Sequence, residues 1–249
     1  MRLAIHQLGN EQRLFWRSRE LAFFTFGLPI LFFVLLGSVY GDDEIDGIRG
    51  SAYLLAGMLG YGVAATAFAG LAITTVIRRE DGILKRLRGT PLPAWAYVCA
   101  VITSTVFVFA LEAVALVILG QVLYDIPFPD RWLSLLLTLL LGGLAFAAMG
   151  LGLTGAIHSA EGSSAVVNAI YLPMAFISGS FFSASSFPPF VEAIADVLPL
   201  TYFIELTRNV LLYNEEIWDN WRAVAVVAAW GVAGGLAALR WFHWEPRAR

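Results

Sequence analysis

Apolar residues along this chain gather into six long stretches, and short polar or charged segments separate each stretch from the next. About 20 residues of α-helix cross a hydrocarbon core of about 30 Å, and every stretch meets or nearly meets that length. In lipid a helix satisfies its own backbone hydrogen bonds, so the pattern predicts helices and not strands. The predicted spans cover residues 21–40, 52–77, 94–119, 132–157, 163–182 and 221–239. We therefore expect an all-α integral membrane protein, with residues 1–249 forming a single transmembrane domain of six transmembrane helices.

The composition agrees with a membrane protein, and the placement of charge predicts its orientation. The chain is 59% hydrophobic and 14% charged, whereas soluble proteins are about a quarter charged. If the N-terminus is cytoplasmic and the chain crosses six times, twelve of the 16 Lys and Arg residues fall in inside segments. The four that fall outside are Arg49, Arg131, Arg208 and Arg222. This positive-inside bias predicts a multi-pass protein of the cell membrane with both termini in the cytoplasm.

Residues 1–20 precede the first predicted span and have two chemically different sides. Phe15 and Trp16 fall with apolar residues on one side of a helix, whereas Arg13 and Arg17, four residues apart, stand on another. A basic amphipathic helix with aromatic residues is typical of segments that lie in the membrane interface. An irregular basic tail that only sets the topology is the alternative.

The charged segment between the second and third predicted spans reads VIRREDGILKRLRGTPLP, over residues 76–93. On a helix, one face collects the apolar residues Ile83, Leu84 and Leu87. The basic residues that point away from this face are Lys85, Arg86 and Arg88. Asp81 can cap the start of such a helix, and Gly89 followed by Pro91 supplies a stop. The pattern predicts an amphipathic helix over residues 81–88 that docks a partner, and a basic loop that only sets topology is the alternative.

Residues 183–212, after the fifth predicted span, form a long segment that is not hydrophilic. It contains two short amphipathic pieces that break at Pro199. Each piece is too short to cross the bilayer, so we expect a re-entrant gate segment on the extracellular side, between spans five and six. A seventh full span is the alternative, but it would have to bury four charged residues, Glu192, Asp196, Glu205 and Arg208.

Glu112 is the one carboxylate well inside a predicted span. Ionised at a helix centre it would cost about 2.5–3.5 kcal/mol, so we expect it to face a cavity, find a partner or be protonated. It is either a group of the substrate path or a residue near the outer end of its span that reaches water. The other candidates for the path and its gate are Asn168, Pro173, Phe176, Ser178, Phe181, Phe182, Pro188 and Pro199. Ordinary helix packing is the alternative for each of them.

The sixth predicted span carries two glycines, Gly231 and Gly235, that are four residues apart. This spacing fits the close packing of two helices. The helix that packs on them belongs either to this chain or to a second copy.

Three segments of the chain together resemble the type-2 ABC exporter permeases, the membrane subunits of bacterial drug, lipid and polysaccharide exporters. They are the basic N-terminal helix, the loop RREDGILKRLRGTP, and FISGSFFSASSFPPFVEAIADVLPLTYFIELTR over residues 176–208. The resemblance implies that the loop is a cytoplasmic coupling helix, which receives force from an ATPase. The coupling residues would be Glu80, Asp81, Gly82, Leu84, Arg86, Leu87, Arg88, Thr90 and Pro91. It further implies a homodimer of permeases with two separate ATPase chains, and an amphipathic drug, lipid or lipid-linked glycan as cargo.

The chain carries no ATP-binding motif of its own, because no phosphate-binding G-x-x-x-x-G-K-[ST] loop occurs in it. Its His, Cys and acidic residues form no metal-ligand or catalytic constellation. We therefore expect a transport subunit and not an enzyme, without a metal or cofactor in this chain, and with Mg-ATP on the partner ATPase. Nucleic-acid binding is disfavoured, because the basic residues spread along one face of a membrane whose lipid surrounds the chain. An ion-gradient-driven transporter or channel and an integral membrane enzyme are the alternatives.

Overall fold

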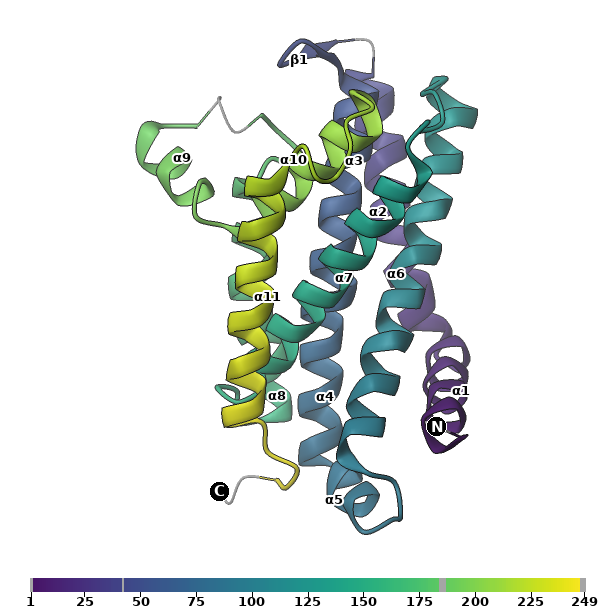
Figure 1. The fold of residues 1–249 in the computed structure, drawn as a ribbon, viewed down its shortest axis with the longest axis vertical. Helices are drawn as coiled ribbons and strands as arrows, with labels where there is room; N and C mark the ends of the chain where they lie inside the picture. The colour runs from purple at the N-terminus through teal and green to yellow at the C-terminus, as the bar shows by residue number, and fades with distance from the viewer. Residues whose placement is uncertain (1, 42, 184–186, 247–249) are drawn as a thin grey trace.

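The computed structural model describes residues 2–41, 43–183 and 187–246, and its long helices run roughly along one axis (Figure 1). The helices are α1 (Arg2–Arg17), α2 (Arg19–Tyr40), α3 (Gly50–Val63), η1 (Ala64–Gly70), α4 (Leu71–Glu80), α5 (Ile83–Arg88), α6 (Ala94–Tyr124), α7 (Trp132–Leu153), α8 (Ala160–Ile177), α9 (Pro189–Ala195), α10 (Pro199–Leu212) and α11 (Trp221–Trp241). Two short antiparallel strands, β1 (Glu44–Ile45) and β2 (Ile48–Arg49), form a hairpin between α2 and α3, with Glu44 opposite Arg49. The elements α3, η1 and α4 make one continuous helix, whose middle section η1 is π-helical.

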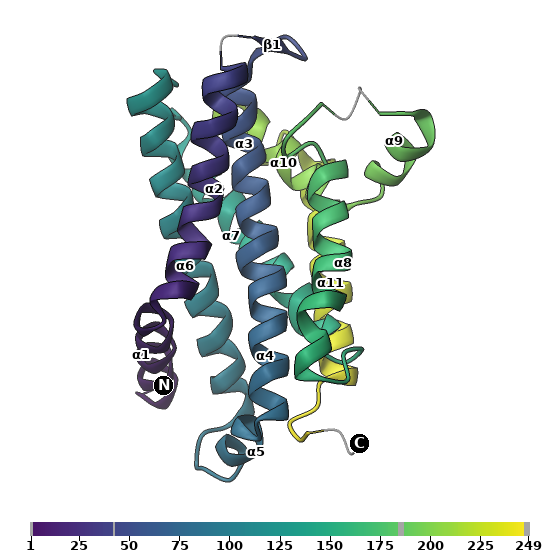
Figure 2. The same cartoon turned by 180° about the vertical axis from the view of Figure 1, so that it is seen from behind.

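Within the described residues, five helices are long and apolar enough to cross a membrane. They are Arg19–Tyr40, Gly50–Glu80, Ala94–Tyr124, Trp132–Leu153 and Trp221–Trp241. These five coincide with every predicted span except the fifth, at residues 163–182. That span corresponds to α8, an 18-residue helix that contains Glu161, Asn168 and Pro173. Because these residues interrupt its apolar stretch, a membrane crossing by α8 stays a prediction, although α8 lies along the same axis beside α4 (Figure 2).

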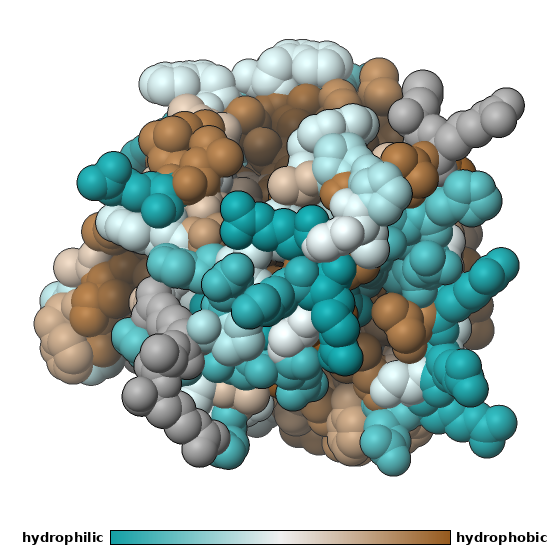
Figure 3. Space-filling view, turned by 90° about the horizontal axis from the view of Figure 1, so that it is seen from below, coloured by the Kyte–Doolittle hydropathy of each residue, from teal (hydrophilic) through white to brown (hydrophobic). Residues whose placement is uncertain are grey.

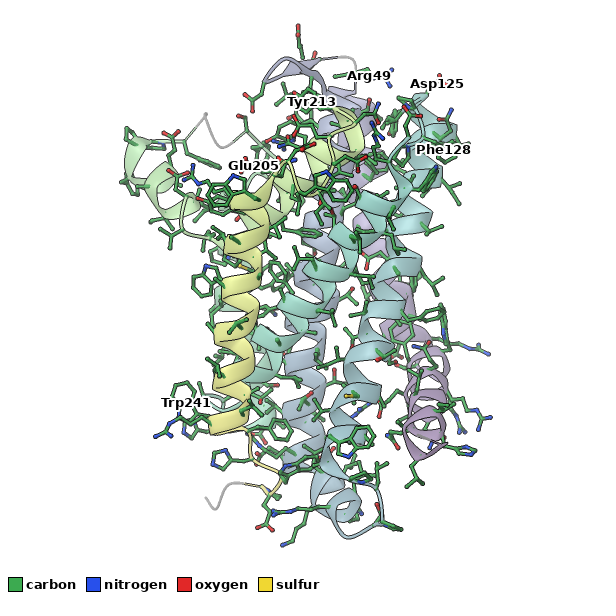
Figure 4. The ribbon with its side chains drawn as sticks, in the orientation of Figure 1. Arg49, Asp125, Phe128, Glu205, Tyr213 and Trp241 are labelled. Atoms are coloured by element: carbon green, nitrogen blue, oxygen red, sulfur yellow. The ribbon has the colours of Figure 1, made fainter. Side chains whose placement is uncertain are left out.

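The bundle has two distinct ends, which we name the α5 end and the hairpin end. The start of α1, the helix α5 and the last turn of α11 lie at the α5 end, whereas β1 and β2 lie at the other (Figure 1). Trp241 marks the α5 end, and Arg49, Glu205 and Tyr213 mark the hairpin end (Figure 4). Because α1 starts and α11 ends at the same end, the chain passes along the bundle an even number of times, which agrees with six crossings. The assignment of the α5 end to the cytoplasm stays a prediction.

The continuous helix from α3 to α4 is the central element of the bundle. All 14 residues of α3 are buried, and α3 packs against α2, α6 and α10 while η1 packs against α7. In the apolar window of this continuous helix 83% of the residues are buried, compared with 17% for α2 and 11% for α11. A helix that is apolar and buried all round belongs in a core. The central helix therefore leads directly from the core to α5.

Two short helices, α9 and α10, form the described part of the predicted re-entrant segment at the hairpin end. The helix α9 stands out to one side, whereas α10 packs against α3, α7 and α11 (Figure 1). The break between them falls at Pro199, the first residue of α10, as predicted. Thr201 Oγ1 donates to the carbonyl oxygen of Ala195 at 2.7 Å and holds this corner closed. The helices have 7 and 14 residues, so a seventh span is wrong, and the depth of the segment in the membrane stays a prediction.

The helices α7 and α11 pack closely through glycine. A Cβ atom at Gly231 would lie 2.8 Å from the Cβ of Ala145, and one at Gly234 would lie 2.5 Å from the Cα of Met149. By contrast, a Cβ at Gly235 would meet no atom within 4 Å. Within this chain the second close contact therefore comes from Gly234 and not from Gly235, because the crossing of the two helices turns Gly234 toward α7. A contact of Gly235 with a second copy stays a prediction.

The substitution Gly234→Ala is expected to lower the free energy of unfolding by about 1–3 kcal/mol, because the added methyl group meets backbone atoms of α7. The matched control Gly235→Ala should be neutral or slightly stabilising, since alanine favours the helix and space is open there. Denaturant unfolding in detergent micelles, followed by circular dichroism, measures both variants. Equal stability of the two variants would contradict this packing.

Candidate functional site

The helix α5 has six residues and begins after a sharp reversal of the chain at Gly82. Gly82 has φ +70°, in the left-handed region that glycine adopts without strain. Gly82, and not Asp81, is the N-cap of α5, so the predicted cap is wrong: α4 continues to Glu80, and Asp81 closes its C-terminus. The helix therefore starts at Ile83, and Asp81 contributes its carbonyl oxygen, to which Arg86 Nη2 donates at 3.2 Å.

The helix α5 presents charged residues at the end of the bundle. Leu84 is fully buried beneath it, and the predicted coupling residues Gly82 and Leu87 are half-buried. The exposed residues of the turn, of α5 and of the segment that follows it include Asp81, Lys85, Arg86, Arg88, Thr90 and Pro91. Seen from the α5 end, hydrophilic side chains gather over the middle of the surface and hydrophobic ones lie around them (Figure 3). Leu84 thus anchors α5 to the bundle, whereas the basic side chains of α5 are exposed and accessible to a partner.

Arg79, near the end of α4, is a buried charged residue. From the sequence it was recognised only as one of the basic residues that produce the positive-inside bias. The residue is 1% exposed. Nη1 donates to the carbonyl oxygen of Thr154 at 2.9 Å, and Nη2 donates to that of Ile157 at 2.6 Å. Nε donates to the carboxylate of Glu80 at 2.7 Å, so this predicted coupling residue holds Arg79. Because the carbonyl acceptors lie 75 and 78 residues away, no local motif reveals these contacts.

The N-terminal segment is a regular helix, α1, that packs against α6 and α2. The alternative of an irregular tail is therefore wrong. The rings of Phe15 and Trp16 have centroids 5.1 Å apart, and Trp16 stacks on Phe26 of α2 at 5.7 Å. Arg13 and Arg17 are exposed, as the predicted amphipathic helix requires. Its location in the membrane interface stays a prediction.

Polar contacts tie α1 to the neighbouring helices. Arg78 Nη1 of α4 forms an ion pair with Glu11 Oε2 at 2.7 Å, and Glu11 is buried. Gln12 Nε2 donates to Ser104 Oγ of α6 at 2.8 Å. Side chains of α1 are thereby bonded to α4 and to α6 near the α5 end.

A cavity of about 420 Å³ lies between α1, α2, η1, α4 and α6. Its polar lining includes Glu11, Ser18, Thr25, Thr66, Arg78 and Ser104. Its apolar lining includes Leu14, Leu21, Phe24, Leu28, Val101 and Val108. The volume lies within the range of small-molecule sites, which are mostly apolar with a few polar groups. A cavity with these two kinds of surface is chemically suited to an amphipathic molecule.

Glu112 lies behind the wall of this cavity. Its side chain is 0% exposed, and Thr66 Oγ1, which lines the cavity, donates to its Oε2 at 2.9 Å. Among the described residues, Oε1 has no hydrogen-bond partner. A Cβ at Gly62 would lie 2.3 Å from this oxygen, so the carboxylate rests against the backbone of α3. Glu112 is enclosed by protein and does not reach the outer surface of the protomer.

Phe181, a predicted gate residue, lies in a cluster of aromatic rings beside the cavity. Its ring centroid is 5.4 Å from that of Tyr61 and 4.9 Å from that of Phe176. Tyr61 lines the cavity, and its hydroxyl shares a hydrogen bond of 3.1 Å with that of Tyr171. Phe182, the second ring of the predicted gate, is instead 45% exposed. Of this cluster, Tyr61 and Tyr171 line the cavity, whereas Phe181 packs against Tyr61 and Phe176 packs against Phe181.

The remaining predicted path residues do not converge on the cavity. On α8, Asn168 is half-buried and Pro173 is exposed. Pro188 is exposed before α9, whereas Pro199 is buried at the start of α10. Ser178 has a buried hydroxyl oxygen without a hydrogen-bond partner in the described part of the chain. The structure thus brings together only part of the predicted set.

Comparison with protein families decides the class of this molecule. The profile of the family described as ABC-2 type transporter matches residues 8–212 of the chain. The chain belongs to the ABC-2 type transporter family. The match includes the cavity and the helix α5, and it identifies the chain as a membrane transport subunit of an ABC transporter. Membership in this family implies association with an ABC ATPase subunit.

Two of the following three relatives of this ABC-2 type permease are named as permeases. "Putative transport permease YvfS" of Bacillus subtilis strain 168 is 25% identical over 205 residues, which are 82% of this chain and 83% of the relative. "Nodulation protein J" of Rhizobium leguminosarum biovar viciae is 27% identical over 215 residues, 79% of this chain and 78% of the relative. "Probable multidrug ABC transporter permease YbhR" of Escherichia coli strain K12 is 21% identical over 166 residues. That match covers 65% of this chain and only 45% of YbhR.

The hydrogen bond from Thr66 to Glu112 is expected to stabilise this ABC-2 type permease. Thr66→Val should lower the free energy of unfolding by about 1–3 kcal/mol, because a buried carboxylate then loses its donor. In a Glu112→Leu background the same change should have little effect, since no carboxylate remains. Denaturant unfolding of the four proteins of this cycle measures the coupling. An equal loss in both backgrounds would mean that Thr66 acts through packing alone.

Proposed function

We propose that this permease is the membrane-spanning subunit of an ATP-driven exporter, which moves an amphipathic drug, lipid or lipid-linked glycan out of the cytoplasm. A separate ATPase subunit binds Mg-ATP and supplies the energy. The observation that carries the proposal is α5, a short helix with exposed basic residues at the end of the buried central helix. An element in this position can receive a displacement from outside the membrane and pass it to the core.

The α5 end faces the cytoplasm in this proposal. The exposed basic residues at this end include Arg13, Arg17, Lys85, Arg86, Arg88 and Arg240. Cytoplasmic segments of membrane proteins carry such an excess of Lys and Arg. ATP is available on that side, so the ATPase subunits meet the permease at α5.

A displacement of α5 reaches the cavity through the central helix. The turn between α4 and α5 has only two residues, Asp81 and Gly82. In α4, Thr75 and Arg78 line the cavity, and η1 adds Thr66. ATP binding therefore moves α5 together with one wall of the cavity. Cargo leaves toward the hairpin end, past the ring of Phe181 and the re-entrant helices.

The lining of the cavity supports an amphipathic cargo. Hydroxyl groups and the Glu11–Arg78 ion pair offer hydrogen bonds to a polar part, and the leucine and valine side chains accommodate an apolar part. The name of the relative YbhR includes the word multidrug, which agrees with an amphipathic drug as cargo. An ion-gradient mechanism has less support, because the predicted spans contain no second carboxylate or histidine that could form a proton relay with Glu112.

The transporter is a homodimer of permeases with two ATPase copies in this proposal. Two helices leave most of their apolar surface uncovered in the protomer: 17% of the apolar window is buried in α2 and 11% in α11. Such a surface contacts lipid or a second permease. A dimer lets each ATPase copy bind one α5.

Charge reversal in α5 tests this proposal. Arg86→Glu combined with Arg88→Glu is expected to abolish association with the ATPase, because repulsion replaces attraction across the interface. Membrane insertion should be unchanged, since both side chains are exposed and lie outside the spans. Tagged permease is isolated from membranes of the native host in mild detergent, and the ATPase that co-purifies is measured by its hydrolysis of ATP.

Arg240→Glu is the control for this experiment. Arg240 is also exposed at the α5 end, but it lies on α11 and outside α5. The control should retain the ATPase at the level of the unchanged protein. Unchanged co-purification after the double reversal in α5 would rule out the coupling role of this helix.

A further inference from the structure

Two neighbouring arginines of α4 bind different parts of the molecule. Arg78 pairs with Glu11 of α1, whereas Arg79 binds Thr154 and Ile157. These two residues belong to the segment 154–159 between α7 and α8, which we name the α7–α8 corner. Both contacts lie just before the chain enters α5. We propose that Arg79 is a positioning residue that makes the α7–α8 corner, and with it α8, follow the movement of α5. This inference rests on the proposed function, in which an ATPase displaces α5.

The contact has the geometry of a rigid fork. The two terminal nitrogens of Arg79 donate to the carbonyl oxygens of Thr154 and Ile157 at 2.9 and 2.6 Å. Its Nε donates to Glu80 at 2.7 Å. A guanidinium group is planar, so these donor directions are fixed relative to one another. Hydrogen bonds from a charged donor are stronger than neutral ones, and at 1% exposure water does not compete for them.

The α7–α8 corner offers acceptors because α7 ends there. The last carbonyl groups of an α-helix have no donor within the helix, and they carry the negative end of its dipole. The helix ends at Leu153, and Thr154 is its C-cap. Arg79 therefore places its positive charge at the C-terminal end of α7, where the helix dipole is negative. Its acceptors are backbone carbonyl oxygens, so these hydrogen bonds attach Arg79 to the main chain of the corner and not to a mobile side chain.

The α7–α8 corner continues into α8, which reaches the cavity. Ser159 is the N-cap of α8, and its Oγ accepts from the amide of Gly162 at 3.1 Å, so the helix begins in a defined place. Farther along α8, Tyr171 lines the cavity and bonds to Tyr61 of α3. The helices α4 and α8 also pack against each other. Arg79 thus connects α5 to a part of the cavity wall that α4 does not form.

Arg79→Gln and Arg79→Lys test this role, with Thr154→Val as the matched control. The control changes a buried side chain in the same corner but keeps the backbone carbonyl that Arg79 binds. Spin labels are placed at Gly89, the C-cap of α5, and at Ser164 of α8, both exposed, in a Cys99→Ser background. The labelled permease, with one labelled copy in each assembly, is isolated together with its ATPase. Pulsed electron paramagnetic resonance measures the α5–α8 distance without nucleotide and with Mg-ATP and vanadate.

The α5–α8 distance is expected to stay the same in both states for the unchanged permease and for Thr154→Val, because the two elements move together. In Arg79→Gln the distance should shift when nucleotide is added. Arg79→Lys should shift less, since an ammonium group donates but lacks the planar fork. A distance in Arg79→Gln that ignores nucleotide, or one that shifts equally in the unchanged permease, overturns the proposal.

Two further outcomes of this experiment concern protein accumulation and ATPase binding, and not the measured distance. If neither Arg79 variant accumulates in the membrane while Thr154→Val does, Arg79 serves folding alone and the positioning role is wrong. If the unchanged permease retains no ATPase, the proposed function fails, and the role of Arg79 fails with it. When the ATPase is retained, the distances alone decide the role of Arg79.

Discussion

One constraint governs this molecule: a polar group that is surrounded by lipid or by protein must find its partner inside the structure. The backbone meets it by forming helices. Arg79 meets it by binding two carbonyl groups, and Arg78 meets it by pairing with Glu11. Glu112 meets it only in part, since one of its two oxygens lacks a donor among the described residues. These contacts join segments that are distant in sequence, so the buried charges add specific links to the apolar packing of the bundle.

The central helix brings these groups into one element. Its first section, α3, is buried on all sides, and its π-helical section carries Thr66, which binds Glu112. π-helical turns are rare and occur frequently at functional sites. The last section, α4, lines the cavity and ends beside α5. The proposed surface for the ATPase, the cavity wall and the buried carboxylate are therefore connected through a single continuous helix.

Much of the helical architecture could be predicted from the sequence, because long apolar stretches have few alternatives in lipid. The same pattern located α5 and the break at Pro199. Local rules failed where the answer depends on a neighbouring element. Asp81 is a good capping residue, but α4 extends to Glu80 and leaves the cap to Gly82. Within this chain the crossing of α7 and α11 turns Gly234, and not Gly235, toward α7.

The contacts of the candidate site could be predicted least. Glu112 was recognised as unusual because a carboxylate in a span is costly, but Thr66, 46 residues away, could not be named as its partner. The cavity takes its lining from α1, α2, α3, η1, α4 and α6 and from Tyr171 of α8. No segment of the sequence contains such a surface. Arg79 resembles any other basic residue of a cytoplasmic loop until its two acceptors are seen.

The central claim is that an ATPase outside this chain supplies all the energy for transport. It is tested most directly by placing the purified permease in vesicles, with and without the ATPase that co-purifies with it, and measuring the accumulation of an amphipathic fluorescent dye. We expect accumulation against a gradient only when the ATPase and Mg-ATP are both present. Uphill accumulation by the permease alone, driven by a proton or sodium gradient, would contradict the account.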